Sequence, residues 1–118
     1  MLLVDTSVWV KHLRDGEVAL EDLLEDGQVV CHPLIVGELA CGNLKNRAEI
    51  LALLQALPTA TVAEHGEVLR FIEVHRLMGK GLGFFDMHLL ASVVLSGIQL
   101  WTLDKRLQQV SLKMGLAY

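Results

Sequence analysis

The segment Leu2-Leu3-Val4-Asp5-Thr6-Ser7-Val8-Trp9, close to the start of the chain, decides how the fold begins. Its first three residues form an apolar run that stops at Asp5, a pattern typical of a buried strand with a polar residue at its carboxyl end. Asp5, Thr6 and Ser7 then offer side chains that cap helices. The sequence therefore predicts a helix directly after this strand, ending near Gly16.

The same alternation of strand and helix continues along the 118 residues. Further strands are predicted at residues 28–31, 59–62, 98–102 and 116–117. Helices are predicted at residues 18–24, 33–42, 48–57, 68–78, 87–95 and 105–110. This order predicts an α/β fold, with a central, mainly parallel sheet of four to five strands between two layers of helices. No linker, repeat or low-complexity segment is visible, so residues 1–118 are expected to form one domain.

The amino-acid composition argues against some classes of function. Hydrophobic residues make up 53% of the chain, yet no apolar run approaches the length needed to cross a bilayer. With no signal-peptide pattern and only two cysteines, we expect a cytoplasmic protein with free thiols and no membrane association. The net charge of -4 argues against nucleic-acid binding through a broad basic surface. It leaves room for an enzyme in which metal ions supply positive charge locally.

Four acidic residues fall where ligands bind in such folds. Asp5 ends the first predicted strand, Asp104 follows the fourth, and Asp86 opens an apolar helix after a glycine-rich loop. Glu38 lies within an otherwise apolar segment, where a solvated carboxylate is not expected. Since parallel sheets bind ligands beyond the carboxyl ends of their strands, these acids are candidates for one shared pocket. Taken singly, each of the three aspartates also fits the role of a helix N-cap.

A shared acidic pocket points to metal chemistry. Carboxylates crowded together repel one another and take up protons unless a cation lies among them. Hard oxygen ligands of this kind suit Mg²⁺ or Mn²⁺, which also bind the phosphate oxygens of a substrate. Such ions activate an attacking water and neutralise charge in phosphoryl transfer. The sequence thus favours hydrolysis of phosphodiester bonds.

Four segments, in order, resemble the motifs of PIN-domain ribonucleases, and particularly of VapC-type toxins. They are Leu3-Val4-Asp5-Thr6-Ser7-Val8-Trp9, Glu38-Leu39 with Gly42, Gly83-Phe84-Phe85-Asp86-Met87-His88-Leu89-Leu90-Ala91-Ser92, and Trp101-Thr102-Leu103-Asp104-Lys105-Arg106-Leu107. A single Asp-Thr-Ser is a weak signal, but four segments in the right order and spacing cover essentially the whole chain. The chain is short even for this family, so loops that contact substrate are expected to be trimmed.

The resemblance implies a three-layer α/β/α sandwich and an Mg²⁺- or Mn²⁺-dependent endoribonuclease that cuts RNA with a metal-activated water. It assigns catalysis and metal binding to a quartet of acids: Asp5, Glu38, Asp86 and Asp104. It matches Thr6 and Thr102 to the family's supporting hydroxyls. It further implies the toxin component of a type II toxin–antitoxin system. Such a toxin is expected to form a homodimer and to bind a VapB-like antitoxin in a heterotetramer or larger complex.

Substrate binding needs cations near the pocket. Among the few available, Arg47 and Lys105 are the residues we expect to meet phosphate, with a solvated surface charge as the alternative for each. Two other functions compete with a nuclease. A receiver-type phosphoacceptor domain would need an aspartate after the third strand, where Val62-Ala63 stands. A non-catalytic PIN-like binding module would not need all four acids.

Overall fold

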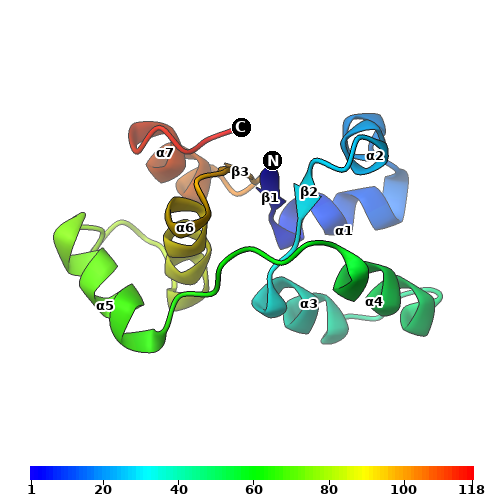
Figure 1. Ribbon diagram of the computed structural model, residues 1–118, viewed down its shortest axis with the longest axis horizontal. Coiled ribbons are helices and arrows are strands. Elements are labelled where there is room, and N and C mark those ends of the chain that lie inside the picture. Colours follow the sequence, from blue (N-terminus) through cyan, green and yellow to red (C-terminus); the bar gives the residue numbers. More distant parts are fainter.

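The computed structural model describes all residues from 1 to 118. Its elements, in chain order, are β1 (Leu2–Val4), α1 (Thr6–Asp15), α2 (Val18–Glu25), β2 (Val29–Val30), α3 (Pro33–Ala40), α4 (Arg47–Ala56), α5 (His65–Val74), α6 (Phe84–Ser96), β3 (Gln99–Trp101) and α7 (Lys105–Lys113). The strands lie at the centre, with α1 to α4 on one side and α5 to α7 on the other (Figure 1). The predicted α/β class is confirmed.

The sheet has three parallel strands in the order β2-β1-β3. The central strand pairs Leu3 with Val30 on one side and with Leu100 on the other. All three residues of β1 are buried. Because β1 is central and parallel to both neighbours, the residues that follow the strands gather at one edge of the sheet.

The sheet is narrower than the four to five strands predicted, because each outer segment contributes a single bridge. Thr59 pairs with Cys31, and Ala117 pairs with Leu100, both in parallel. After Thr59 the chain leaves the sheet, since the backbone N–H of Thr61 donates to Ser96 Oγ on α6 at 2.8 Å. At the other edge, the pairing consists of two backbone hydrogen bonds, from Leu100 N to Leu116 O at 2.8 Å and from Tyr118 N to Leu100 O at 2.9 Å.

Most predicted helices are present, but α5 begins and ends earlier than predicted. The backbone N–H of Glu64 donates to Glu67 Oε1 at 2.9 Å, which fixes the first turn of α5. The helix ends at Val74, and Arg76 turns the chain with a φ of 53°. α6 also begins before the predicted residue 87, so Asp86 lies inside its first turn rather than ahead of it.

The core is one cluster of 23 buried hydrophobic residues. α6 crosses its middle, and six consecutive or near-consecutive residues of this helix, Met87, Leu89, Leu90, Ala91, Ser92 and Val93, are buried. This depth of burial fixes the direction of α6 and therefore the place of Asp86 at its start. No helix has the length and apolar character that crossing a bilayer requires.

Candidate active site

Asp5 lies at the carboxyl end of β1 and is only 6% exposed. Its Oδ2 accepts hydrogen bonds from Thr102 Oγ1 at 2.7 Å and from Ser7 Oγ at 2.9 Å. Its backbone N–H donates to Trp101 O at 2.9 Å, which continues the pairing of β1 with β3. A buried carboxylate needs such donors to keep its charge. One oxygen of Asp5 is thus fixed, and the other makes no hydrogen bond within the protein.

Ser7 was not among the site residues predicted from the sequence, yet it joins the two sides of the site. Besides donating to Asp5, its Oγ accepts the backbone N–H of Leu103 at 3.0 Å and lies 3.4 Å from Thr102 Oγ1. The signal available in the sequence was the Asp-x-Ser spacing at the start of a helix. In this turn the hydroxyl of Ser7, rather than that of Thr6, donates to the carboxylate of Asp5.

Asp5 and Asp104 both lie within electrostatic range of Asp86. The pKa of Asp86 is raised, first by burial and further by the charges of Asp5 and Asp104, against a lowering hydrogen bond from the backbone of Gly83. That bond runs from Gly83 N to Asp86 Oδ2 at 3.3 Å. Asp104 is the N-cap of α7, and its Oδ1 accepts the N–H of Leu107 at 2.9 Å. The structure therefore brings three of the four predicted acids to one edge of the sheet.

Glu38 differs from the other three acids. The sequence suggested a carboxylate on an apolar face, whereas the structure places Glu38 on the exposed side of α3, with Ile35 and Leu39 facing the core. A residue next to Leu39 is rotated by about 100° from it around the helix, which turns Glu38 towards solvent. No group of three or more His, Cys, Asp or Glu side chains is arranged here to hold a metal ion.

The other site residues predicted from the sequence lie in different surroundings. Thr102 orients Asp5, as described above, whereas Thr6 Oγ1 is buried with no hydrogen-bond partner. Arg47 Nη1 donates to Ala40 O at 2.6 Å and so satisfies a carbonyl at the end of α3, away from any carboxylate. Lys105 is the exposed first residue of α7, next to Asp104.

The donor set fits a hard divalent cation. The carboxylates of Asp5, Asp86 and Asp104 supply oxygen atoms. Burial raises the pKa of Asp86 most, and the charges of Asp5 and Asp104 raise it further; a cation would relieve this repulsion. The unpartnered Thr6 Oγ1 is a buried oxygen next to Asp5 in sequence, and such atoms are rare in folded proteins.

His32 connects the two helices that carry Glu38 and Asp86. It is 1% exposed, its Nδ1 accepts the N–H of Leu34 at 3.0 Å, and its Nε2 lies 3.0 Å from Ser92 Oγ on α6. Since Nδ1 is an acceptor, the neutral ring carries its proton on Nε2 and donates it to Ser92. Burial, with a smaller contribution from His88, lowers the pKa of His32 to about 4.

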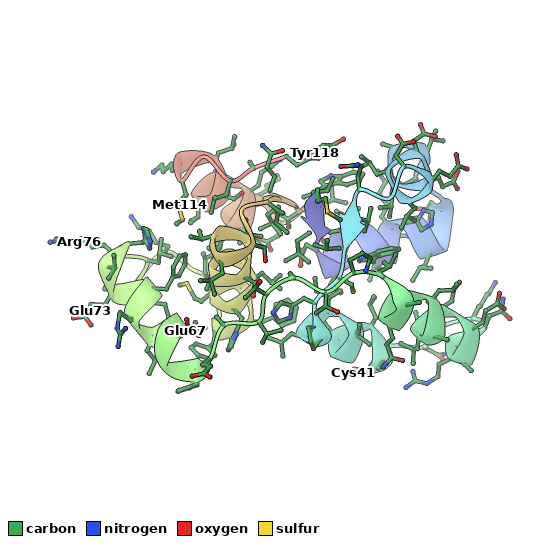
Figure 2. The ribbon with its side chains drawn as sticks, in the orientation of Figure 1. Cys41, Glu67, Glu73, Arg76, Met114 and Tyr118 are labelled. Atoms are coloured by element: carbon green, nitrogen blue, oxygen red, sulfur yellow. The ribbon has the colours of Figure 1, made fainter.

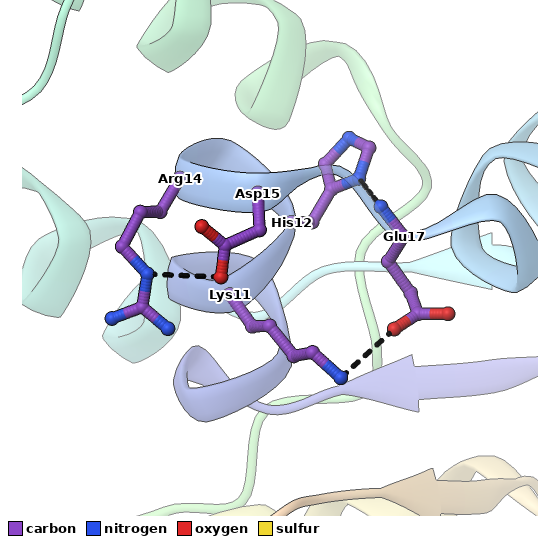
Figure 3. A network of polar contacts seen from close by, with 5 residues as sticks. All are labelled: Lys11, His12, Arg14, Asp15 and Glu17. Atoms are coloured by element: carbon purple, nitrogen blue, oxygen red, sulfur yellow. Dashed lines mark hydrogen bonds and ion pairs between the residues drawn. The ribbon is translucent and has the colours of Figure 1, made fainter.

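The cations of α1 are engaged with neighbouring acids (Figure 3). Lys11 Nζ lies 3.4 Å from Glu17 Oε2, and Arg14 Nε lies 3.1 Å from Asp15 Oδ2. His12 Nδ1 accepts the backbone N–H of Glu17 at 3.1 Å. This network closes the turn between α1 and α2 and leaves α1 without an unpaired lysine or arginine.

Comparisons with known proteins agree with this geometry. The sequence matches the PIN domain family over residues 2–113. It is 48% identical over 118 residues to proteins named Ribonuclease VapC32 from two Mycobacterium tuberculosis strains, CDC 1551 / Oshkosh and ATCC 25618 / H37Rv, covering 99% of this chain and 95% of each relative. The crystal structure of PAE2754 from Pyrobaculum aerophilum shares the fold, with a TM-score of 0.60 at 16% identity over 97% of this chain and 88% of that one. The chain belongs to the PIN-domain family.

Proposed function

We propose that this chain is a VapC-type endoribonuclease, the toxin of a type II toxin–antitoxin system, and that residues 1–118 form its PIN domain in the cytoplasm. The observation that carries the proposal is the buried carboxylate of Asp5, fixed by Ser7 and Thr102 beside Asp86 and Asp104. Identity of 48% to relatives named as ribonucleases supports the same activity.

The cofactor in this proposal is Mg²⁺ or Mn²⁺. Asp5, Asp86 and Asp104 would hold it, with Glu38, an exposed residue of α3, as the fourth proposed ligand. When bound, such an ion supplies Lewis-acid activation of water and neutralises charge on the phosphate. The chain itself orients the ligands.

Orientation comes from hydrogen bonds that hold each carboxylate by one oxygen. Thr102 Oγ1 donates to Asp5 and also accepts the backbone N–H of Asp104 at 3.1 Å. Asp104 is fixed in turn by the N–H of Leu107. Second-layer contacts of this kind keep ligands in place and often matter nearly as much as the ligands themselves. One hydroxyl therefore sets the positions of two acids.

The proposed partners are an RNA substrate and a VapB-like antitoxin. A toxin homodimer that binds antitoxin in a heterotetramer or larger complex completes the proposal. Co-expression with the neighbouring small open reading frame tests the pairing. We expect growth arrest by this chain alone, relief by the partner, and no arrest by Asp5→Asn. Arrest that persists in Asp5→Asn would contradict an activity based on this site.

The activity is tested with purified protein and a mixture of cellular RNAs in Mn²⁺. We expect cleavage that EDTA abolishes and that Asp5→Asn reduces by at least about a hundredfold, because the ligand is buried and cannot be replaced by water. The matched control is Asp22→Asn, an exposed aspartate on α2 remote from the site, which should cleave as the wild type does.

Two results of this assay would count against the proposal. Equal cleavage by wild type and Asp5→Asn would mean that the activity belongs to a contaminant or to another site. No cleavage by the folded wild type on any RNA fraction, with Mn²⁺ present, would instead favour a non-catalytic PIN-like binding module.

A further inference from the structure

A basic cavity lies between the C-terminal end of α5 and the exposed face of α7. Its volume is about 400 Å³, and its charged lining residues are Arg76, Lys80, Arg106 and Lys113. Neutral residues and His75 complete the wall, and no aspartate or glutamate contributes to it. Figure 2 shows Arg76 and Met114, which both line the cavity, on the same side of the molecule.

The concentration of charge here is unusual for this chain. The protein has a net charge of -4 and ten lysines and arginines, of which four line this one cavity. The ion pairs of the structure involve only Lys11 and Arg14, so no carboxylate neutralises the four cavity cations. A group of unpaired cations without acids attracts polyanions, and it does so locally even when the whole protein is acidic.

The side chain of Arg106, an exposed residue of α7, passes close to the backbone of the glycine-rich loop. It lies against Gly81, where an added Cβ would come within 2.7 Å of Arg106 Nη1 and 2.9 Å of its Cδ. Gly81 itself has a φ of 80°, a conformation that favours glycine. The absence of a side chain at Gly81 thus leaves room for Arg106 at the wall of the cavity.

Arg76 occupies a backbone position where glycine is usual. The N–H of Leu77 donates to Ile72 O at 3.0 Å and that of Arg76 to Glu73 O at 3.2 Å, the pairing that closes a helix with a left-handed residue. Arg76 is that residue, with a φ of 53°. Arg76 thus places a cationic side chain at the wall of the cavity from a backbone conformation that would suit glycine better.

The glycine-rich loop between α5 and α6 connects the cavity with the candidate active site. Lys80 lines the cavity, and Gly81 lies against the side chain of Arg106 on α7. Two residues after Gly81, the backbone N–H of Gly83 donates to Asp86 Oδ2 at 3.3 Å. The cavity therefore adjoins the start of α6, where Asp86 lies.

We propose that this cavity binds backbone phosphates of the RNA strand, on one side of the bond to be cut. The proposal rests on the proposed ribonuclease function and adds the site that holds the strand. Arginine forks suit phosphate oxygens, and four separate cations match a strand with regularly spaced charges. Continuity with Asp86 through the glycine-rich loop favours the RNA over an acidic peptide as the occupant.

The test is RNA binding without cleavage. A short fluorescein-labelled single-stranded RNA is titrated with protein in EDTA, and fluorescence anisotropy gives the Kd at several salt concentrations. We expect Arg76→Gly and Lys113→Ala each to weaken binding by up to about fivefold, the effect of one solvent-screened charge pair. Each should also lower the slope of log K against log salt by about 0.7.

The matched control is Arg70→Ala, which removes the same charge from the exposed side of α5, outside the cavity. It should retain the wild-type Kd and salt slope. Because glycine suits the backbone at position 76, a loss of binding in Arg76→Gly with unchanged or raised Tm cannot be attributed to misfolding.

Wild-type Kd and salt slope in both cavity variants would overturn the proposal. So would equal losses in Arg70→Ala, which would indicate diffuse charge attraction, or displacement by a polyglutamate peptide but not by unlabelled RNA. The ribonuclease proposal fails separately, through absence of Mn²⁺-dependent cleavage, whatever the anisotropy shows.

Discussion

Thr102 and Asp5 lie 97 positions apart in the chain and are joined by a 2.7 Å hydrogen bond from Oγ1 to Oδ2. Both side chains are buried, at 3% and 6% exposure. The bond connects the end of β1 with the end of β3, and Ser7 Oγ lies beside both residues. The order of the strands, with β1 and β3 adjacent and parallel, is what brings this hydroxyl to this carboxylate.

Removal of that hydroxyl should impair catalysis more than folding. Thr102→Val keeps the shape of the side chain but leaves Asp5 with Ser7 as its remaining donor. We expect kcat to fall by about tenfold or more, with a loss of about 1 to 3 kcal/mol in the free energy of unfolding. Thr102→Ser keeps the hydroxyl and should therefore retain most of the wild-type kcat and most of the wild-type free energy of unfolding. RNA cleavage and urea unfolding measure the two effects, and full activity in Thr102→Val would refute the orienting role.

Asp86→Asn should stabilise the metal-free protein at neutral pH. The pKa of Asp86 is raised by burial and by Asp5 and Asp104, so folding disfavours its ionised form. An acid whose pKa is raised by folding lowers the stability as pH rises from its ordinary pKa of 3.8 through its raised pKa in the folded state. Above that raised pKa the full loss of stability remains. Asparagine carries no such penalty and still accepts the N–H of Gly83.

Urea unfolding in EDTA measures this prediction, with Asp22→Asn as the exposed control. The midpoint should rise for Asp86→Asn, remain unchanged for Asp22→Asn, and the gain should disappear in acid. A lower urea midpoint for Asp86→Asn at neutral pH would show that burial and the charges of Asp5 and Asp104 do not destabilise the ionised carboxylate of Asp86.

His32 should make the fold sensitive to acid. Its pKa is lowered from 6.5 to about 4 by burial, so the folded state holds the neutral ring. The stability from this group is complete above pH 6.5 and declines as pH falls towards 4, because the unfolded chain takes up a proton first. Between about pH 7 and about pH 5 the loss amounts to about 2 kcal/mol.

The variant His32→Asn keeps a helix-capping acceptor and removes the titration. Its free energy of unfolding should be lower at pH 7 and should fall less between about pH 7 and about pH 5 than that of the wild type. His75→Gln, which changes an exposed histidine at the end of α5, should keep the wild-type pH dependence. If the free energy of unfolding fell equally with pH in the wild type and in His32→Asn, the acid sensitivity could not be assigned to His32.

Glycine at position 76 should stabilise the fold. The left-handed conformation is unfavourable for arginine by about 1 to 2 kcal/mol, and greater freedom of glycine in the unfolded chain offsets part of the gain. We expect a net increase of about 0.5 to 1 kcal/mol, or a few degrees in Tm. The same substitution inside α5, Arg70→Gly, should destabilise by about 1 kcal/mol. If Arg76→Gly and Arg70→Gly changed the free energy of unfolding in the same direction, the left-handed conformation of residue 76 could not be the cause.

Local chemistry accounts for what the sequence predicted well. The apolar run before Asp5 gave β1, Gly16 ends α1 with a φ of 79°, and Pro33 occupies the first turn of α3. Each of these features is decided within a few residues, by burial or by capping. The parallel α/β arrangement followed from their order and is confirmed.

Features decided between distant segments were not predictable from local pattern. The predicted strand at residues 59–62 reduces to one bridge because Thr61 binds Ser96 on α6 instead. Glu38 looked buried by composition, but its angle around α3 turns it outward. The bond of Ser7 to Asp5 is local, but its bond to Leu103 and the lining of the basic cavity both depend on contacts across the fold.

The most direct test of the central claim is calorimetric titration of the metal-free protein with Mn²⁺. If Asp5, Asp86 and Asp104 share a divalent cation, the wild type and Asp22→Asn should show the same saturable binding, and Asp5→Asn and Asp86→Asn should lose at least about tenfold in affinity. Identical Mn²⁺ binding in all four proteins, or none in the folded wild type, would contradict it.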